Sequence, residues 1–289
     1  MIVVNNNDSG LCNRIKLMGQ ALAWGLEFNQ DVTHNYFYDL KKYLNLDDSI
    51  LPINVRLPYA SNAKIWVHNQ YKAIKRHLHF GQSETRENIR KRLADGRSVK
   101  INLWTVREPM GFIQYQKKIA KYLAPKEEYQ IYADGIIKDI KDGRDVHLIA
   151  LHMRRGDYKN WRGGKYYFDE NNYIKWINDI VDEFGNNACV LLFTNEKFDI
   201  ERARREVKYK DIYLMKGNAV QDLTTMSKCE YIVGPPSTYS EMAAYYGNAM
   251  YLNLYNKEQN IRLKEFKTLR EIYEAYYNIE IDSDESERK

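Results

Sequence analysis

From residue 146 onward, short apolar runs alternate with amphipathic stretches in a regular order. Apolar runs of this length are typical of strands that are buried on both faces of a parallel sheet. The expected strands are 146–153, 188–194, 211–215, 230–234 and 249–254. Between them, apolar residues at helical spacing predict helices over 173–184, 197–207 and 221–228. Repeated β-α units imply right-handed crossovers, so this half of the chain is predicted to form a Rossmann-like domain.

The first half of the chain begins with the same alternation, but its pattern is less regular. Ile2–Val4 is an expected strand, followed by a polar loop and by a helix over 13–28. Further expected strands are 31–38, 65–67 and 99–105, and further expected helices are 112–123 and 127–141. The polar run 141–145 is the best candidate for a domain boundary, which divides the chain into 1–143 and 144–289. We therefore predict an α/β protein with two Rossmann-like domains that face a cleft.

The composition describes a globular protein with one large domain or two of ordinary size. Of the 289 residues, 44% are hydrophobic and 29% are charged. No apolar run approaches the ~20 residues of a membrane span. Met1 leads directly into the expected strand Ile2–Val4, which leaves no room for a signal peptide. Three cysteines without metal-ligand spacing favour free thiols in a reducing compartment, so we expect a cytoplasmic protein.

The net charge of +5 is small, but it is concentrated in one segment. Residues 72–107 contain ten Lys and Arg residues against three acidic ones. A segment of this kind is able to face an anionic membrane surface, an acidic acceptor or nucleic acid. A solvated helix over 85–93 accounts for the same charges without any partner. We expect no nucleic-acid binding, because no recognition module accompanies the basic segment.

A cluster of charged residues follows directly after the first strand of the second half. His152, Arg154, Arg155 and Asp157 stand where this strand ends, and open α/β sheets bind ligands at the carboxyl ends of their strands. Two guanidiniums suit a phosphate, because each offers a planar fork of donors and keeps its charge. The alternatives are a solvated surface and a structural ion pair in which Asp157 neutralises Arg155. The tripeptide from Arg155 to Asp157 also matches a cell-adhesion motif, but its place behind a buried strand argues against adhesion.

The loop after the first strand of the chain is a second candidate ligand site. Gly10 precedes a helix N-terminus there, whose free N–H groups and dipole favour an anion or a sugar. Asn13 and Arg14 add side-chain donors. Many turns between a strand and a helix carry Gly for backbone geometry alone, and this interpretation stays open.

A third candidate site follows the expected strand 230–234. Two prolines precede the run Ser237-Thr238-Tyr239-Ser240, which opens another helix. The hydroxyl and amide groups of this run are candidate phosphate donors. Thr238 and Glu241 have capping-box spacing, so Glu241 is interpreted as a helix cap and not as a catalytic base.

Asp222 has two interpretations. In the first turn of the expected helix 221–228, its carboxylate interacts favourably with the helix dipole. In a nucleotide site, the same carboxylate is able to accept the paired N–H donors on the edge of guanine. The residues around Asp222 do not decide between the two.

The order of these segments resembles that of the inverting fucosyltransferases that use GDP-fucose, and most closely the alpha-1,2-fucosyltransferase family. The His-x-Arg-Arg-Gly-Asp-Tyr motif of that family, which contains the HxRRxD pattern, is matched in full from His152 to Tyr158. The family's Gly-rich turn resembles 10–14, its helix before a Ser-Ser-Phe-Ser element resembles 221–229, and that element resembles 237–240. A Gly-Tyr-x-Gln stretch is faintly similar to 111–114. The resemblance covers nearly the whole chain in islands, and it implies the GT-B arrangement of two Rossmann-like domains.

The resemblance implies roles for individual residues. Arg154, with Arg155 beside it, would clamp the β-phosphate of GDP, and His152 and Asp222 would read the guanine or its ribose. Residues Ser237, Thr238, Tyr239 and Ser240 would hold the pyrophosphate. Asn13 and Arg14 would line the fucose or phosphate side, in an acceptor-side domain 1–143 that complements a GDP-sugar-binding domain 144–289. Glu241-Met242 and Asn195-Glu196 depart from the family pattern, which bears on the acceptor and the linkage more than on the donor.

The implied reaction transfers fucose from GDP-L-fucose to a glycan hydroxyl with inversion. Arginine and helix-end N–H groups stabilise the leaving GDP, so neither a metal nor another cofactor is expected. The only Asp-x-Asp pattern, 282–284, falls in a charged terminal run. The candidate bases are Asp8 and Asp157. A buried Asp157 beside Arg155 would have a depressed pKa and serve as an anchor, which leaves Asp8 as the preferred base, although an Asp beside Ser and Gly is usually turn chemistry.

Two other functions remain compatible with these residues. A transferase for another GDP-deoxysugar, such as GDP-rhamnose, would share the nucleotide-binding residues. A non-catalytic nucleotide- or glycan-binding protein would share the fold, but the intact set of His152, Arg154 and Asp157 argues against it.

Overall fold

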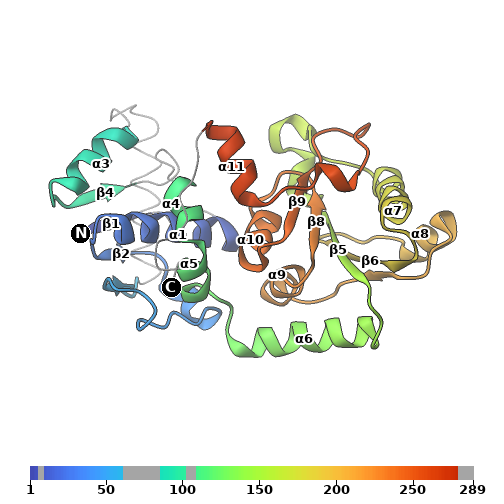
Figure 1. Cartoon of the computed structure of the whole chain (residues 1–289), viewed down its shortest axis with the longest axis horizontal. Coiled ribbons are helices and arrows are strands. Elements are labelled where there is room, and N and C mark those ends of the chain that lie inside the picture. The colour runs from blue at the N-terminus through green and yellow to red at the C-terminus, as the bar shows by residue number, and fades with distance from the viewer. Residues whose placement is uncertain (6–9, 61–84, 102–108, 279–289) are drawn as a thin grey trace. The chain divides into compact units, whose positions relative to one another are not determined.

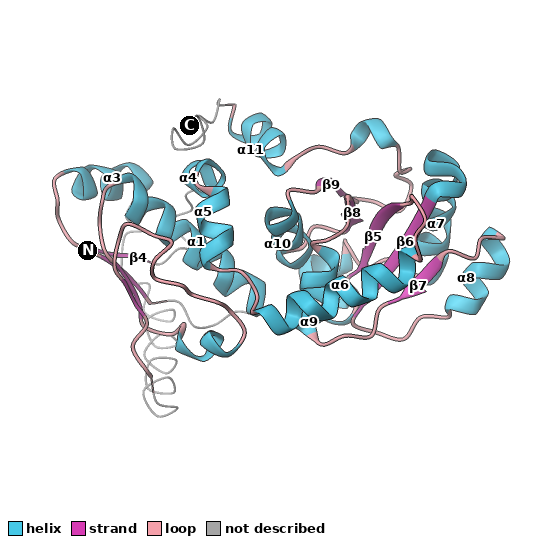
Figure 2. Ribbon diagram, turned by 60° about the horizontal axis from the view of Figure 1, so that its bottom comes forward, coloured by secondary structure: helices cyan, strands magenta, loops and turns pink. Residues whose placement is uncertain are grey.

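The computed structural model describes residues 1–5, 10–60, 85–101 and 109–278. Within these ranges the chain separates into two compact units, one that ends at Ala124 and one that begins at Pro125. Each unit contains one β-sheet whose paired strands are all parallel, flanked by helices (Figures 1 and 2). Asp8 and the expected strand 65–67 lie outside the described residues.

The sheet of the first unit has the strand order β3-β2-β1-β4. Ile2 and Val4 on β1 and Val32 on β2 are fully buried, as expected for short strands that specify a core with apolar residues. The order of the strands reverses next to β1, and ligands of doubly wound sheets bind at the carboxyl ends beside such a reversal. The strands are β1 (Ile2–Val4), β2 (Val32–His34), β3 (Val55–Arg56) and β4 (Val99–Ile101).

The main helix of the first unit is α1 (Leu11–Glu27), which begins directly after Gly10. It packs on β1 and β2, and also on the short helices α4 (Pro109–Gln114) and α5 (Gln116–Tyr122). Helix α3 (Arg86–Ala94) begins after Thr85, whose side chain accepts a hydrogen bond from the Asn88 N–H. Helix α3 and strand β4 are the main described part of the basic segment 72–107, whose residues 72–84 and 102–107 lie outside the described ranges.

The sheet of the second unit has the strand order β7-β6-β5-β8-β9. Strand β5 lies in the middle, with β6 and β7 on one side and β8 and β9 on the other. The order therefore reverses between β5 and β8, which makes the carboxyl ends of these strands the expected ligand position. The strands are β5 (His147–Met153), β6 (Ala188–Thr194), β7 (Ile212–Leu214), β8 (Tyr231–Gly234) and β9 (Met250–Asn253).

Helices cover both faces of the second sheet (Figure 2). One face carries α7 (Glu170–Phe184) and α8 (Ile200–Val207), and the other carries α9 (Ala219–Met226) and α10 (Thr238–Gly247). Helix α11 (Leu269–Tyr277) packs against α10. Helix α6 (Glu127–Lys141) packs along α9 and belongs to the second compact unit, whereas a boundary at residue 143 assigns it to the first.

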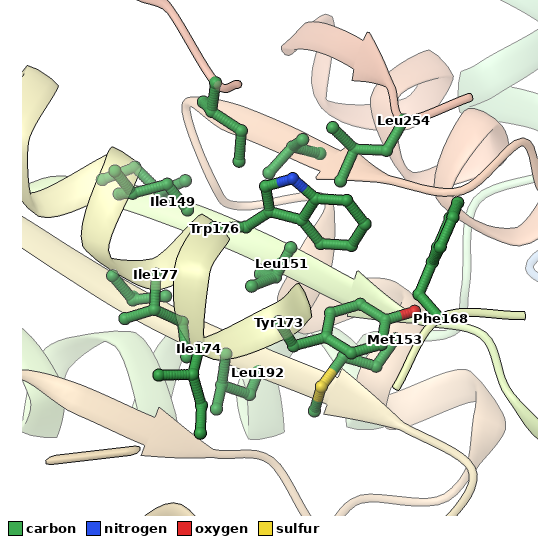
Figure 3. Packing of buried hydrophobic residues seen from close by; sticks show 14 of the residues in the cluster. Ile149, Leu151, Met153, Phe168, Tyr173, Ile174, Trp176, Ile177, Leu192 and Leu254 are labelled. Carbon is green, nitrogen blue, oxygen red and sulfur yellow. The ribbon is translucent and has the colours of Figure 1, made fainter. Parts of the chain in front are cut away.

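The core of the second unit lies between α7 and the sheet (Figure 3). Trp176 and Tyr173 are fully buried on α7, where they face Ile149 and Leu151 of β5. The indole Nε1 of Trp176 donates to the Gln259 carbonyl at 2.8 Å, so its polar atom is satisfied. This packing anchors β5, the strand that carries the charged cluster at its carboxyl end.

The structure confirms the predicted α/β class and the Rossmann-like second half. The five strands expected there are present, with ends displaced by one residue at most. The first half differs more. The strand expected over 31–38 ends at His34, and the chain then enters a 3-10 turn over Tyr38–Lys42. The helix expected over 112–123 is interrupted at Tyr115, and β3 carried too little pattern to be predicted.

No helix in the described ranges is both long enough and apolar enough to cross a membrane.

Candidate functional site

A cavity of about 220 Å³ lies at the carboxyl ends of β5 and β6. Its other walls come from the segment before α9, the first turn of α9 and the first turn of α10. The position agrees with the ligand site expected for this strand order. The cavity is lined by His152, Arg154, Phe193, Thr194, Asn195, Gly217, Ala219, Asp222 and Tyr239.

His152 lines the cavity as a neutral imidazole. Its side chain is almost fully buried, and burial, together with the nearby Arg154 charge, lowers its pKa to about 3. Its ring lies against the ring of Tyr239, with centroids 5.4 Å apart. Its Nδ1 atom is buried and has no hydrogen-bond partner among the described residues. A buried polar atom without a partner is costly, so this nitrogen indicates a place where a ligand would be recognised.

Gly234, at the end of β8, allows the chain to pass close to His152. A Cβ atom on Gly234 would lie 2.5 Å from the His152 carbonyl oxygen, which no side chain tolerates. Glycine is therefore required where β8 runs beside β5 at the edge of the cavity.

Among the described residues that line this cavity, Asp222 contributes the one acidic side chain. Its Oδ1 atom accepts a hydrogen bond from the Gly217 N–H at 2.9 Å. Burial raises the pKa of Asp222 to about 6, and the hydrogen bond from Gly217 opposes that shift. Helix α9 is capped by Asn218 and Gln221, in a complete capping box. Asp222 lies in the first turn of the helix, as its helix-dipole interpretation expects, and it also lines the cavity.

Arg154 also lines the cavity, and it is held by its neighbours on the same loop. Its Nη2 atom donates to Asp157, with distances of 3.0 Å and 2.9 Å to the two carboxylate oxygens. Its guanidinium lies over the ring of Tyr158. The Tyr158 hydroxyl donates to the Pro236 carbonyl at 2.5 Å, which ties the loop after β5 to the loop after β8. Arg154 is one-third exposed, so its remaining donors are accessible.

The pairing expected between Asp157 and Arg155 is wrong. Asp157 pairs with Arg154, is 60% exposed and is therefore not the buried anchor that its position suggested. Arg155 is largely buried and turns away to Glu170 and Glu196, with nitrogen–oxygen distances of 3.6 Å and 3.3 Å. Its Nη2 atom also donates to the Tyr167 hydroxyl at 3.0 Å. Arg154 and Arg155 lie in the loop after β5, where the backbone of Arg155 is no longer extended, with a φ of −113° and a ψ of −108°, and their side chains reach different partners.

The capping box expected at Thr238 and Glu241 is also wrong. Helix α10 begins one residue earlier, with Ser237 as its N-cap, and the Ser237 side chain accepts from the Tyr239 N–H at 3.2 Å. Glu241 instead accepts a hydrogen bond from the Tyr273 hydroxyl of α11. The cap is set by the extended backbone of Ser237, a feature that the spacing of residue types does not contain.

The run 237–240 does not act as one unit. Ser237 caps the helix, and Thr238 is partly exposed. Tyr239 lines the cavity, while its hydroxyl donates to the Ala219 carbonyl at 2.7 Å. Ser240 is fully buried, and its hydroxyl lies 3.2 Å from both the Ser237 carbonyl oxygen and the Tyr251 hydroxyl. The hydroxyl of Ser240 therefore belongs to the interior and not to the cavity.

In the first unit, Asn13 and Arg14 lie in the first turns of α1. The Arg14 guanidinium forms a two-pronged pair with Asp39 and also donates to the Tyr36 carbonyl. Both of its terminal nitrogens are thus engaged within the unit. The hydrogen bonds of Arg14 hold Asp39 ionised by lowering its pKa.

The sequence interpretation missed several residues that line the cavity. Phe193 and Thr194 end β6, and Gly217 and Ala219 flank the start of α9. Their signal was available, because they stand at the carboxyl end of an expected strand and before an expected helix. In the described part of the chain, no group of three or more His, Cys, Asp or Glu residues is placed to hold a metal ion.

Comparison with known proteins gives a clear result for the fold only. No protein-family model matches the chain. No curated protein matches its sequence either. The solved structures give 53 matching chains.

Three of these structures show the similarity. The fucosyltransferase NodZ from Bradyrhizobium has a TM-score of 0.55 at 11% identity, over 87% of this chain and 94% of that chain. A mutant of Arabidopsis thaliana FUT1 in complex with GDP has a TM-score of 0.55 at 12% identity, over 92% of this chain and 73% of that chain. POFUT1 in complex with GDP-fucose has a TM-score of 0.50 at 11% identity, over 88% of this chain and 96% of that chain. The likeness spans both units and confirms the predicted GT-B-type α/β class.

Proposed function

We propose that the chain is a glycosyltransferase that moves fucose from GDP-L-fucose to a glycan hydroxyl with inversion, without a metal ion. The observation that carries the proposal is the cavity of the second unit, where His152, Asp222 and Arg154 converge at the carboxyl ends of the central strands. The resemblance of the His152–Tyr158 run to the alpha-1,2-fucosyltransferase family supports the same donor. The similar structures NodZ, FUT1 and POFUT1 are fucosyltransferases or complexes with GDP or GDP-fucose, which supports it independently.

In this proposal, the guanine of the GDP-sugar occupies the inner part of the cavity. Guanine presents two adjacent N–H donors, and Asp222 offers a carboxylate acceptor that only the Gly217 N–H engages among the described residues. The neutral imidazole of His152 and the ring of Tyr239 supply flat surfaces beside it. Uracil has one ring N–H group between two carbonyl oxygens, so a carboxylate acceptor favours guanine.

The diphosphate occupies the mouth of the cavity, beside Arg154 and the first turn of α10. A guanidinium at one-third exposure keeps donors free for a phosphate while Asp157 fixes its direction. The N–H groups at the start of α10 add the positive end of a helix dipole. Thr238 and the backbone of 237–240 take part through these groups, and Arg155 and Ser240 support the loop from the interior.

The chemistry follows from the charge that develops on the leaving group. As the fucosyl carbon becomes oxocarbenium-like, negative charge accumulates on GDP, and preorganised donors stabilise it more than they stabilise the bound ground state. The acceptor hydroxyl attacks from the opposite face and transfers its proton to a carboxylate, for which Asp8 is preferred and Asp157 is the alternative. Residues 1–143, with Asn13 and Arg14, form the acceptor side, and 144–289 bind the donor.

The test is a transfer assay with a panel of glycan acceptors and a chelator present. The full chain is incubated with GDP-fucose, GDP-rhamnose or UDP-sugars, and both released nucleotide and glycosylated product are measured. The proposal expects products from GDP-fucose in the presence of the chelator, with inverted configuration at the transferred sugar. Turnover restricted to a UDP-sugar, or strictly dependent on added Mg²⁺ or Mn²⁺, would refute it.

A further inference from the structure

The two residues that follow β6 bind the backbone of the loop that follows β5. The Asn195 Oδ1 atom accepts a hydrogen bond from the Arg155 N–H at 3.1 Å, and the Glu196 Oε1 atom accepts one from the Gly156 N–H at 3.0 Å. The turn that presents them is itself closed, because the Glu196 N–H donates to the Thr194 hydroxyl at 3.1 Å. Two neighbouring strands of the sheet are thereby joined at the edge of the cavity.

Successive backbone N–H groups of this kind form a concave site that suits an anion. Here the protein fills this site itself, because the amide oxygen of Asn195 and the carboxylate of Glu196 accept from the two N–H groups. Gly156 has a φ of +33°, and a Cβ atom at this position would lie 2.4 Å from the Asn195 Nδ2 atom. The loop thus requires glycine at the point where the Asn195 side chain enters. This requirement gives Gly156 a role that the adhesion tripeptide does not explain.

The same carboxylate is also close to the second arginine of the motif. Glu196 Oε2 lies 3.3 Å from Arg155 Nε, which is an ion-pair distance without hydrogen-bond geometry. Glu170 lies 3.6 Å from Arg155 Nη1 and makes the comparable charge contact from α7. The two acids differ in one respect. Glu196 binds the loop backbone, whereas the contacts of Glu170 with this loop are confined to the Arg155 side chain.

We infer that Glu196, assisted by Asn195, is a positioning residue that directs the Arg154 guanidinium toward the diphosphate of the donor. Asn195 holds the peptide group that directly follows Arg154, and Glu196 holds the next one. Together they restrain the backbone from which the Arg154 side chain leaves. Losing this support leaves Asp157, which is exposed, and the ring of Tyr158 as the restraints on the Arg154 guanidinium. The inference rests on the proposed function, because it assumes that Arg154 meets a nucleoside diphosphate.

The inference separates the phosphate part of the cavity from the base part. Glu196 acts on Arg154, whereas His152 and Asp222 are held by β5 itself and by Gly217. Removing the Glu196 carboxylate is therefore expected to weaken the binding of a ligand that carries phosphates and to leave the binding of a ligand without phosphates unchanged. A merely stabilising ion pair would instead change the affinities for both ligands equally, or neither.

The experiment measures the affinities of the full chain for GDP and for guanosine by calorimetric titration, in the unmodified protein and three variants. Glu196→Ala removes both contacts, Glu196→Gln keeps an acceptor for the Gly156 N–H, and Glu170→Ala is the matched control at similar exposure. We expect Glu196→Ala to weaken the binding of GDP on the order of tenfold or more, while the affinity for guanosine changes by less than about twofold. Glu196→Gln should recover most of the loss, and Glu170→Ala should leave both affinities within about twofold of those of the unmodified protein.

Two results would overturn the inference. In the first, Glu196→Ala loses GDP affinity and guanosine affinity to the same extent. In the second, Glu170→Ala loses as much GDP affinity as Glu196→Ala does. Both results require that the unmodified protein binds GDP, so neither of them contradicts the proposed function. An unmodified protein that binds neither GDP nor guanosine refutes the proposed function and this inference with it.

Discussion

Two buried histidines lie near the carboxyl ends of strands, one in each sheet, yet their surroundings differ. His34 ends β2 and His152 lies near the end of β5, and burial lowers the pKa of each to about 3. Each ring also has one buried nitrogen without a partner among the described residues. His34 accepts a hydrogen bond from the Tyr36 N–H through Nδ1 and packs against Phe37, so its ring is part of the interior. His152 lines a cavity beside Arg154 and Asp222. A histidine at a strand end therefore indicates a site only when its neighbours leave space for a ligand.

The same contrast applies to the arginines. Both terminal nitrogens of Arg14 donate hydrogen bonds, to Asp39 and to the Tyr36 carbonyl, and the Arg14 side chain is largely buried. Arg154 uses one terminal nitrogen on Asp157 and stays one-third exposed at the cavity. Arg14 of the first unit helps to hold that unit together, whereas Arg154 of the second unit remains partly exposed at the cavity. Each prediction below tests whether this difference between the units is functional.

The largest effect is expected from the proposed base in the first unit. Asp8→Asn should reduce transfer roughly 100- to 10,000-fold because the acceptor proton loses its destination, while the affinity for GDP is unchanged. Asp157→Asn should instead weaken GDP binding, since Asp157 directs Arg154. Transfer kinetics and GDP titrations on both variants measure these two effects separately. Undiminished transfer in Asp8→Asn would remove that residue from the mechanism.

Arg154→Ala, and also Arg154→Lys, should lower transfer by about 3–4 kcal/mol of transition-state stabilisation. Lysine keeps the charge but loses the planar fork that a diphosphate requires. Circular dichroism should show an unchanged fold, because the side chain is partly exposed. Arg262→Lys, in an exposed pair with Glu183, is the control and should keep full activity. Retention of most activity by Arg154→Lys would contradict the assignment of this residue to the diphosphate.

Asp222→Asn should weaken GDP binding by about 1–3 kcal/mol, because an amide places a donor against the guanine donors. In the unmodified protein, the affinity for guanosine, which carries no phosphate that titrates, should rise as the pH increases through about 6, the raised pKa of the Asp222 carboxyl.

Stability should respond in the opposite sense. A carboxyl with a raised folded pKa binds its proton more tightly in the folded state, so the folded protein loses stability as the pH rises from about 4 through 6. Asp222→Asn should remove that loss, which thermal unfolding across this pH range measures. A guanosine affinity independent of pH between about 5 and 7 would count against the proposed contact with guanine.

The smallest effect separates the two histidines directly. Both have depressed pKa values, so the unfolded state binds more protons between about 3 and 6.5, and stability falls as the pH decreases through that range. His34→Gln and His152→Gln should each reduce this acid sensitivity, and only the second should weaken GDP binding. Equal effects of the two substitutions on GDP affinity would remove the distinction between the units.

Much of the second unit could be predicted from its sequence, because buried parallel strands are read directly as apolar runs. The strand over 188–194 was predicted to the residue, and the cluster from His152 to Asp157 was placed at a strand end. The partners within that cluster could not be predicted. Asp157 and Arg155 are near in sequence, but Arg155 turns to Glu170 and Glu196, which come from other elements.

The first unit was harder to predict for a related reason. Its strands are two or three residues long, and a run of that length carries almost no periodicity. The cap of α10 also escaped prediction, because Ser237 and Thr238 are chemically equivalent caps and only the backbone angles distinguish them. Long-range contacts and backbone angles decide such points, and neither is encoded in local spacing.

The central claim is that the cavity of the second unit binds the guanosine diphosphate part of a sugar donor. Thermal unfolding of the full chain with GDP or UDP and a chelator tests it most directly. GDP at about 100 times its dissociation constant should add roughly 2.7 kcal/mol to the free energy of unfolding, and Arg154→Ala should lose most of that gain at the same concentration. UDP should stabilise far less. An equal shift with both nucleotides, or a GDP shift that Arg154→Ala leaves intact, would contradict the claim.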